Sequence, residues 1–259
     1  MDQRINSLAA CPVCANSARN LFKEDPQWPS YRCSDCGTVF LDPMPDAAAL
    51  AALYTDAYEG AATGYFSKPE KKLRRSRGRI RLLHKFMPSP ARFLDIGCNG
   101  GFMTEAAREA GYDAWGIEPD PVSISYARTH FTQCHFTEGT IEGFSPTNPD
   151  GAPLQFDLAY CSEVIEHIPE PASFLAHVHR LLKPGAIFYL TTPDISHPRR
   201  PRDVTAWDGY CPPSHCIYFT PKSLTRLLGA CGFSVIRKQI AFKPGIKLIA
   251  RRDDRPDRV

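Results

Sequence analysis

Four cysteines near the start of the chain have the spacing of a metal site. Cys11 and Cys14 form one C-x-x-C pair, Cys33 and Cys36 form a second, and eighteen residues separate the pairs. Each pair can sit on a tight turn that points two thiolates at one ion, and two such pairs complete a tetrahedral zinc site without an open position. We therefore expect a structural zinc ribbon over residues 1–45, because so short a segment needs the metal to fold.

A second group of residues could hold a nucleotide-like ligand. The stretch FLDIGCNGG (93–101) reads as a buried strand that runs into a glycine-rich turn, and Glu118 lies twenty-one residues after Gly97. A carboxylate at that point can accept hydrogen bonds from both hydroxyls of a ribose. Asp95 would repel a pyrophosphate, and the glycines lack the G-x-G-x-x-G spacing that a pyrophosphate needs. The pattern therefore favours a ligand that carries a cationic amine and sulfonium over a dinucleotide such as NAD.

Two histidines could take up a proton near neutral pH. His167 lies in EVIEHIPEP, just past an expected strand, and His215 lies in the proline- and aromatic-rich stretch 193–221. A capping or packing role is the alternative for His167, and a role in fixing the loop is the alternative for His215. We favour His215 as a catalytic base and keep His167 as the second candidate. A metal site of Cys211, His215 and Cys216 is disfavoured, because adjacent residues rarely reach one ion together.

Size and composition are those of a globular protein with one large domain and a small appendage. The chain has 259 residues, of which 43% are hydrophobic and 23% charged, and its formal net charge of +3 is too small to imply a polyanionic partner. No apolar run approaches the roughly 18 to 20 residues of a membrane helix, and the N-terminus lacks the apolar stretch of a signal peptide. We therefore expect a cytoplasmic protein with reduced thiols and no membrane partner.

From residue 91 onward, short apolar stretches alternate with helical patterns. Strands are expected at 91–96, 113–118, 134–139, 156–161 and 186–192, with two more at 233–240 and 245–251, and helices at 101–111, 121–130, 171–182 and 221–232. Such alternation predicts a parallel sheet with helices on both faces. In sheets of this kind the ligand lies at the carboxyl ends of the strands, where the strand order reverses.

The segment between the cysteines and this domain is basic. An alanine-rich helix is expected at 47–57 after the capping residue Asp46. Residues 68–85 carry nine Lys or Arg and a single Glu, with a narrow apolar stripe at helical spacing. We interpret this segment as a solvated amphipathic helix that packs on the main domain. The alternative is a basic surface that binds phosphate or RNA, which we favour less. The absence of interleaved aromatic residues weakens the RNA alternative.

Four segments together resemble class I S-adenosylmethionine-dependent methyltransferases. They are FLDIGCNGGFMTEAAREAGYDAWGIEPD, FDLAYCSEVIEHIPEP, LLKPGAIFYLTTPD and SHCIYFTPKSLTRLLGACGF, in this order. The resemblance covers residues 88–250 and is greatest to bacterial enzymes with an N-terminal cysteine zinc ribbon, many of which act on sugars, glycans or small metabolites. It implies a Rossmann-like α/β sheet of seven mostly parallel strands. The implied domains are the ribbon, a helical linker or lid at 46–88, and a methyltransferase domain at 89–252 whose insertion 193–221 covers the acceptor.

The resemblance also implies which residues bind the cofactor, S-adenosylmethionine. The methionine part would lie near Asp95, Gly97, Cys161 and Ser162, the ribose near Glu118 and Pro119, and the adenine near Thr140 and Ile141. Gly100 and Gly101 would let the chain pass close to the cofactor, and Cys98 and Asn99 belong to the same cofactor-binding turn. Asn99 departs from the usual glycine of the turn. Asparagine tolerates a left-handed backbone better than most residues, so we expect the turn to persist.

The expected function is methyl transfer to a small-molecule acceptor, most simply a hydroxyl of a sugar, glycan or secondary metabolite. An RNA-modifying enzyme that grips RNA through the ribbon and residues 68–85 is the first alternative. Methylation of a sugar carbon is the second, although related enzymes carry Glu-His where this chain has Ser214-His215. A scaffold that binds the cofactor without catalysis is a third. The sequence leaves the identity of the acceptor and the oligomeric state open.

Overall fold

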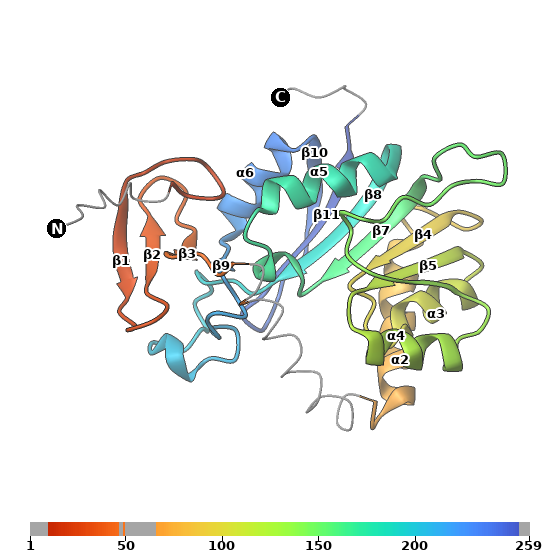
Figure 1. Cartoon of the computed structure of the whole chain (residues 1–259), viewed down its shortest axis with the longest axis horizontal. Coiled ribbons are helices and arrows are strands. Elements are labelled where there is room, and N and C mark those ends of the chain that lie inside the picture. Colours follow the sequence, from red (N-terminus) through yellow and green to blue (C-terminus); the bar gives the residue numbers. More distant parts are fainter. Residues whose placement is uncertain (1–9, 47–48, 50–65, 254–259) are drawn as a thin grey trace.

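The computed structural model describes residues 10–46, 49 and 66–253 (Figure 1). The helix expected at 47–57 lies, apart from residue 49, outside these residues. No helix within them is long and apolar enough to cross a membrane. Two sheets organise this part of the chain: a small sheet at its N-terminal end, and a large sheet with helices on both faces.

The large sheet has seven strands in the order β10-β11-β8-β7-β4-β5-β6. Their bounds are β4 Arg92–Ile96, β5 Asp113–Glu118, β6 His135–Glu138, β7 Phe156–Ser162, β8 Leu182–Thr192, β10 Phe233–Lys238 and β11 Ile246–Arg252. Only the two pairs that β11 makes are antiparallel. The order reverses between β4 and β7, so their carboxyl ends border the expected ligand position. The predicted Rossmann-like class I sheet is confirmed.

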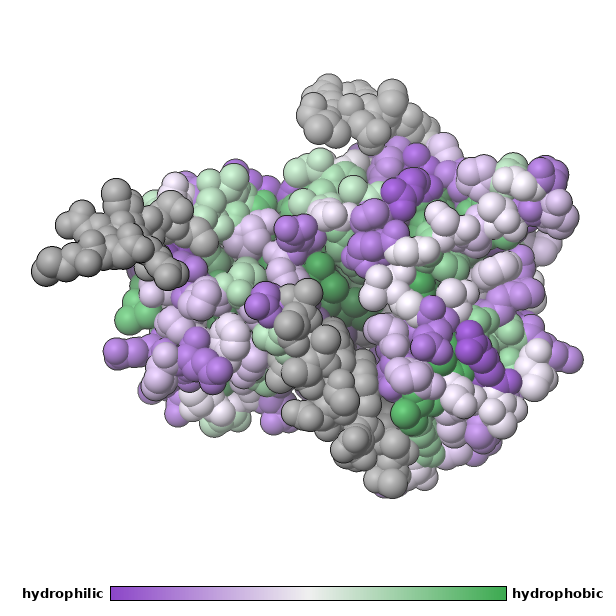
Figure 2. All heavy atoms as spheres, viewed as in Figure 1, coloured by the Kyte–Doolittle hydropathy of each residue, from purple (hydrophilic) through white to green (hydrophobic). Residues whose placement is uncertain are grey.

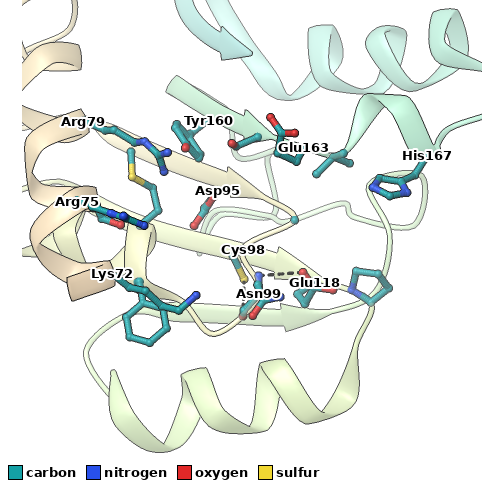
Figure 3. A pocket seen from close by; sticks show the side chains of 17 residues that line it. Lys72, Arg75, Arg79, Asp95, Cys98, Asn99, Glu118, Tyr160, Glu163 and His167 are labelled. Carbon is teal, nitrogen blue, oxygen red and sulfur yellow. Dashed lines mark hydrogen bonds between the residues drawn. The ribbon is translucent and has the colours of Figure 1, made fainter. Parts of the chain in front are cut away.

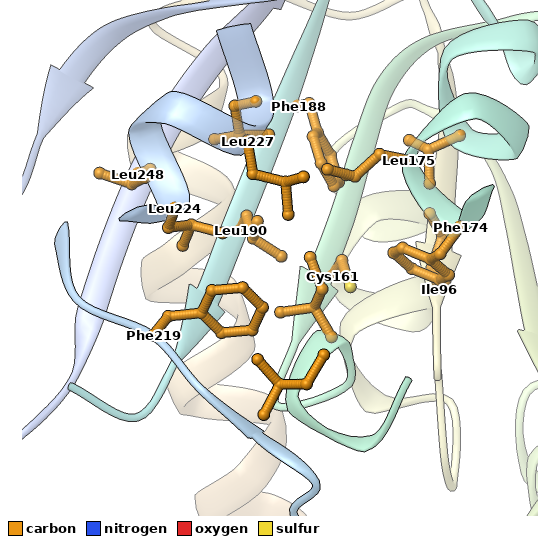
Figure 4. Close-up of a cluster of buried hydrophobic side chains, with 14 of the residues drawn as sticks. Ile96, Cys161, Phe174, Leu175, Phe188, Leu190, Phe219, Leu224, Leu227 and Leu248 are labelled. Atoms are coloured by element: carbon orange, nitrogen blue, oxygen red, sulfur yellow. The ribbon is translucent and has the colours of Figure 1, made fainter. Parts of the chain in front are cut away.

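Both faces of this sheet are buried, because successive side chains of a strand point to opposite sides. The helices that cover it are α2 Pro69–Leu83, α3 Phe102–Glu109, α4 Pro121–His130, α5 Pro171–Leu181 and α6 Pro221–Ala230. On one face Phe93 packs in a cluster with Leu83 of α2 and Met103 of α3. On the other face Ile96 packs in the cluster that α5 and α6 complete with Phe174 and Leu224 (Figure 4).

The largest difference from the expected boundaries lies before the fifth expected strand. That strand was expected to start at residue 186, after a helix at 171–182, but β8 already begins at Leu182. Leu182 is buried and extended, and it pairs with Phe156 across from β7. The register then shifts before the next pair, so Pro184 and Gly185 form an irregularity within the strand. A proline is tolerated at such a point because no ladder hydrogen bond is needed there.

The small sheet joins the cysteine segment to a distant part of the chain. It has the order β1-β2-β3-β9, with β1 Arg19–Lys23, β2 Ser30–Cys33, β3 Val39–Leu41 and β9 Ile217–Tyr218. Strand β9 comes from the stretch 193–221 and pairs antiparallel with β3. The Leu41 N–H donates to the Cys216 carbonyl oxygen (3.0 Å), and the Ser30 and Tyr210 hydroxyls hydrogen-bond at 2.8 Å. The N-terminal segment therefore supports the insertion directly.

Candidate functional site

The turn after β4 has the left-handed backbone that its residue types suggested. Gly97 and Asn99 have φ values of 72° and 46°, and the Asn99 side chain accepts a hydrogen bond from the Gly100 N–H at 2.7 Å. A Cβ at Gly97 would lie 2.5 Å from Val164, so no side chain fits there. The expectation that Asn99 preserves the turn is confirmed, since asparagine adopts this conformation at low cost.

Two buried carboxyl groups flank this turn. The Glu118 carboxylate accepts the Asn99 N–H at 2.9 Å and the Asp120 N–H at 3.0 Å, which fixes it at the end of β5. Asp120 in turn caps α4 by accepting the Ser123 N–H at 2.9 Å. Burial raises the pKa of Glu118, and these backbone N–H groups oppose the shift. Burial raises the pKa of Asp95 to about 7, although Thr104 donates to it at 2.9 Å.

A cavity of about 500 Å³ opens between this turn and helix α2 (Figure 3). Its lining residues are Lys72, Arg75, Ser76, Arg79, Asp95, Gly97, Cys98, Asn99, Phe102, Met103, Glu118, Pro119, Tyr160, Ser162, Glu163, Val164 and His167. Lys72, Arg75 and Arg79 are spaced to lie on one face of α2 and bring three cations to a wall opposite His167. The expectation of a helix at 68–85 that packs on the main domain is confirmed, but this face of it lines the cavity.

A second cavity, of about 650 Å³, adjoins the first and is more apolar in its lining. Thr140 and Ile141 line it, together with Ile96, Ile117, Ile168 and Phe174. Gly97, Pro119, Val164 and His167 line both cavities, so the two spaces adjoin at these residues. In the space-filling view, apolar side chains gather in a hollow near the centre of the face shown (Figure 2).

The two candidate bases lie next to each other. The rings of His167 and His215 are 4.6 Å apart between centroids, although the residues belong to the short helix η1 (Ile165–His167) and to the insertion. Burial, and then the neighbouring His215, lower the pKa of His167 to about 4. Burial also lowers the pKa of His215. Both imidazoles are therefore neutral at pH 7. His167 lines both cavities. His215 lines neither cavity and contacts the His167 ring instead.

Some expected cofactor residues lie behind the cavity walls. Gly100, Gly101 and Cys161 line neither cavity, and Cys161 is fully buried in the core beneath α5 and α6. Gly101 is instead the N-cap residue of helix α3 and has a φ of 77°. The remaining expected residues line one cavity or both. Their backbone positions at or just after the ends of β4, β5, β6 and β7 account for this, since the carboxyl ends of these parallel strands lie at the same edge of the sheet.

Several polar residues of the site were not singled out in the sequence analysis, among them Lys72, Arg75, Arg79, Tyr160 and Glu163. Glu163 has a φ of 57°, an uncommon backbone conformation that clusters at functional sites. Its carboxylate accepts a hydrogen bond from Thr191 at 3.0 Å, and burial raises its pKa. The i, i+3, i+7 spacing of the three cations was the signal that could have found them.

The four N-terminal cysteines converge as their spacing predicts. One sulfur from each lies within 4.8 Å of the others, with Cys11 and Cys36 3.6 Å apart and Cys14 and Cys33 3.5 Å apart. Sulfurs bound at about 2.3 Å to one tetrahedral ion lie roughly 3.8 Å apart, so these distances fit zinc. None of the four is in a disulfide. The donor set and the spacing therefore suit a closed structural site.

Solved structures with a similar fold include several methyltransferases. A Burkholderia thailandensis 1,6-didemethyltoxoflavin-N1-methyltransferase, solved with 1,6-didemethyltoxoflavin and S-adenosylhomocysteine, is 19% identical with a TM-score of 0.60. The match covers 91% of this chain and 100% of that one. The [4+2]-cyclase SpnF, 16% identical with a TM-score of 0.54 over 68% and 81% of the two chains, has the fold too. These likenesses establish the fold and leave the reaction to be argued from the site.

Sequence relatives are more specific. The ubiquinone biosynthesis O-methyltransferase of Methylococcus capsulatus is 32% identical over 127 residues, which are 44% of this chain and 54% of that protein. The chain spans about half the length of the curated relatives it matches. A family described as a methyltransferase domain matches residues 69–238, which include the glycine turn, both carboxylates and both histidines. The chain therefore belongs to this methyltransferase domain family.

Proposed function

We propose that the chain transfers the methyl group of S-adenosylmethionine to an oxygen of a small-molecule acceptor. The observation that carries this is the pair of adjoining cavities, with Glu118 lining the first beside Pro119, which lines both. The adenine would lie in the more apolar cavity beside Thr140 and Ile141, and the ribose hydroxyls would donate to Glu118. The methionine part would extend into the first cavity. Its amine would lie near Asp95, where an ionised carboxylate stabilises a cation.

The cations of α2 would complete this assignment. A methionine part that places its amine at Asp95 leaves its carboxylate to be bound by a second group. Arg75 and Arg79 line the same cavity, and Arg79 lies 6.0 Å from the centre of the Tyr160 ring. Guanidinium groups bind carboxylates through paired hydrogen bonds. This accounts for the cationic face of α2 without RNA, which favours a small-molecule acceptor over the RNA alternative.

The acceptor would approach the junction of the cavities, where His167 lies. Displacement at a sulfonium needs little more than alignment of the acceptor oxygen with the methyl group. The acceptor proton must leave as the carbon–oxygen bond forms, and His215 or His167 would receive it. An oxygen acceptor is also what the name of the Methylococcus relative specifies for that protein. A hydroxyl of a sugar, glycan or other metabolite fits this role.

We also propose that Cys11, Cys14, Cys33 and Cys36 bind structural zinc. Four thiolates leave no position open for a substrate, so the ion would stabilise the fold and take no part in the transfer. Its place beside β9 would let it support the insertion that carries His215.

Calorimetry with S-adenosylhomocysteine tests the cofactor assignment. We expect binding in the micromolar range, and transfer of labelled methyl from S-adenosylmethionine to hydroxyl-bearing acceptors in a panel of sugars, nucleotide sugars and phenols. The position of the label, read by nuclear magnetic resonance of the product, distinguishes oxygen from carbon. A folded chain that binds neither cofactor nor product would contradict the proposal.

Replacement of Arg79 by methionine tests the assignment of the carboxylate. We expect about tenfold weaker binding of S-adenosylhomocysteine, because an exposed charge-assisted pair contributes about 1 to 1.5 kcal/mol. Binding of 5′-methylthioadenosine, which lacks the amino-acid part, should be unchanged. The matched control is Arg74→Met, which alters an exposed arginine on the same helix that does not line the cavity. Equal losses for the two ligands would refute the assignment.

A further inference from the structure

Three potential metal ligands meet beside the cavities. Glu166, His167 and His215 each offer one ligand atom, and these atoms lie within 4.8 Å of one another. The two rings stand nearly perpendicular, at 81°. This group is separate from the cysteine cluster and differs from it in donor type, with two imidazole nitrogens and one carboxylate oxygen. Such a set is typical of sites for divalent transition metals that keep a coordination position open.

Both histidines are held in the tautomer that suits a metal ligand. Nδ1 of His167 lies 2.7 Å from the Ser214 carbonyl oxygen, and Nδ1 of His215 lies 3.0 Å from the Gly209 carbonyl oxygen. A carbonyl oxygen can only accept, so each Nδ1 carries the proton and each Nε2 carries the lone pair. Metal-binding histidines usually donate their second nitrogen in this way, which fixes the orientation of the ring.

The carboxylate of Glu166 has an unsatisfied atom. Its side chain is 1% exposed, and Oε2 accepts a hydrogen bond from Thr192 at 2.8 Å. Oε1 is buried and accepts no hydrogen bond from an N–H or hydroxyl donor in the part of the chain that the structure describes, and the Glu163 carboxyl lies against the same group. Two buried carboxyls in contact cannot both ionise cheaply, and a bound cation would stabilise the charge on both. The Cys216 N–H, which donates to the Glu166 carbonyl oxygen at 2.9 Å, fixes the backbone beside His215.

We propose that Glu166, His167 and His215 bind a divalent transition-metal ion, with Zn²⁺ the best match to two imidazoles and one carboxylate. Ligands at about 2.1 Å from one ion lie roughly 3.4 Å apart, so small side-chain rotations would close the site around it. Because His167 lines both cavities, the open position would face the point where they adjoin. An oxygen of the acceptor, such as its hydroxyl, would bind there, and the bound ion would lower the pKa of that hydroxyl so that its proton can leave to solvent. In this metal-bound state both histidines are ligands, and neither acts as the base. This role rests on the proposed methyl transfer, whereas the binding of the metal does not.

Metal counting on the full chain tests the site. We expect the wild-type chain, dialysed against Co²⁺ or Zn²⁺, to retain about one ion more than His167→Gln or His215→Gln. In the cobalt form, the thiolate-to-cobalt absorption band reports the cysteine cluster alone and should be the same in all three proteins. The matched control is His177→Gln on α5, which should retain as many ions as the wild type. Equal metal content in the wild type and both site variants would overturn the proposal.

A measurement on the wild type alone covers the case in which the variants do not fold. In a cobalt titration, total bound cobalt should exceed the amount that the thiolate band accounts for. If all bound cobalt is bound by thiolate, the site does not exist. Binding of S-adenosylhomocysteine by the same samples separates the two proposals. A chain that binds the extra ion but not S-adenosylhomocysteine would support the metal site and contradict the proposed methyl transfer. A chain that binds S-adenosylhomocysteine but not the extra ion would contradict the metal site and leave the proposed methyl transfer standing.

Discussion

Replacing Glu118 by alanine will weaken the binding of S-adenosylhomocysteine about 100-fold or more. Two hydrogen bonds between ribose hydroxyls and a buried carboxylate contribute about 1.5 kcal/mol each at the least, and each 1.4 kcal/mol is a factor of ten in affinity. The same carboxylate accepts the Asn99 and Asp120 N–H groups, so the alanine variant also releases the glycine turn from the end of β5. Calorimetry on the full chain measures the loss directly.

The neighbouring strand supplies a matched control for this prediction. Glu138 pairs with Glu118 in the register of β5 and β6, but it is exposed and lines neither cavity. Glu138→Ala should change the affinity by less than about twofold. Glu118→Gln, which keeps an oxygen acceptor of similar size, should fall between wild type and alanine. Equal affinities for Glu118→Ala and Glu138→Ala would exclude Glu118 from the ribose site.

Much of the sheet could be predicted because its signals are local. A buried strand, a turn with glycine at a left-handed position, and a proline that opens the next helix are all encoded within a few residues, as Gly97 and Pro121 illustrate. Each strand end could then be placed at the same edge of the sheet. Glu118 and Asp95 were accordingly expected beside one cavity, and both line it.

The rest of the site depends on contacts between distant segments, which spacing does not encode. His167 and His215 are 48 positions apart, and the contact of their rings requires the insertion to fold back onto η1. The pairing of β3 with β9 is of the same kind. The basic helix was a different case. Its charges were visible, but only the packing of Leu83 against the sheet reveals that Arg79 faces the cavity.

Removal of the proposed zinc will loosen the insertion as well as the ribbon. In Cys33→Ser one thiolate is lost, and metal binding in small cysteine sites supplies on the order of 10 kcal/mol of folding energy. Strand β3 would then lose its support, and its hydrogen bonds to β9 would open. We expect amide exchange in residues 30–41 and 215–219 to accelerate about 100-fold or more, measured by hydrogen–deuterium exchange and mass spectrometry. Strands β4 and β5 should remain protected.

The pattern of exchange distinguishes this coupling from general destabilisation. Cys231→Ser, which changes a partly buried cysteine at the end of α6, should leave both segments protected. Binding of S-adenosylhomocysteine to Cys33→Ser should stay within about threefold of wild type, since Glu118 and Asp95 lie on the large sheet. If residues 30–41 exchange faster while 215–219 stay protected, the ribbon and the insertion are independent. Joint loss would instead mean that the cysteine cluster holds His215 in place through β9.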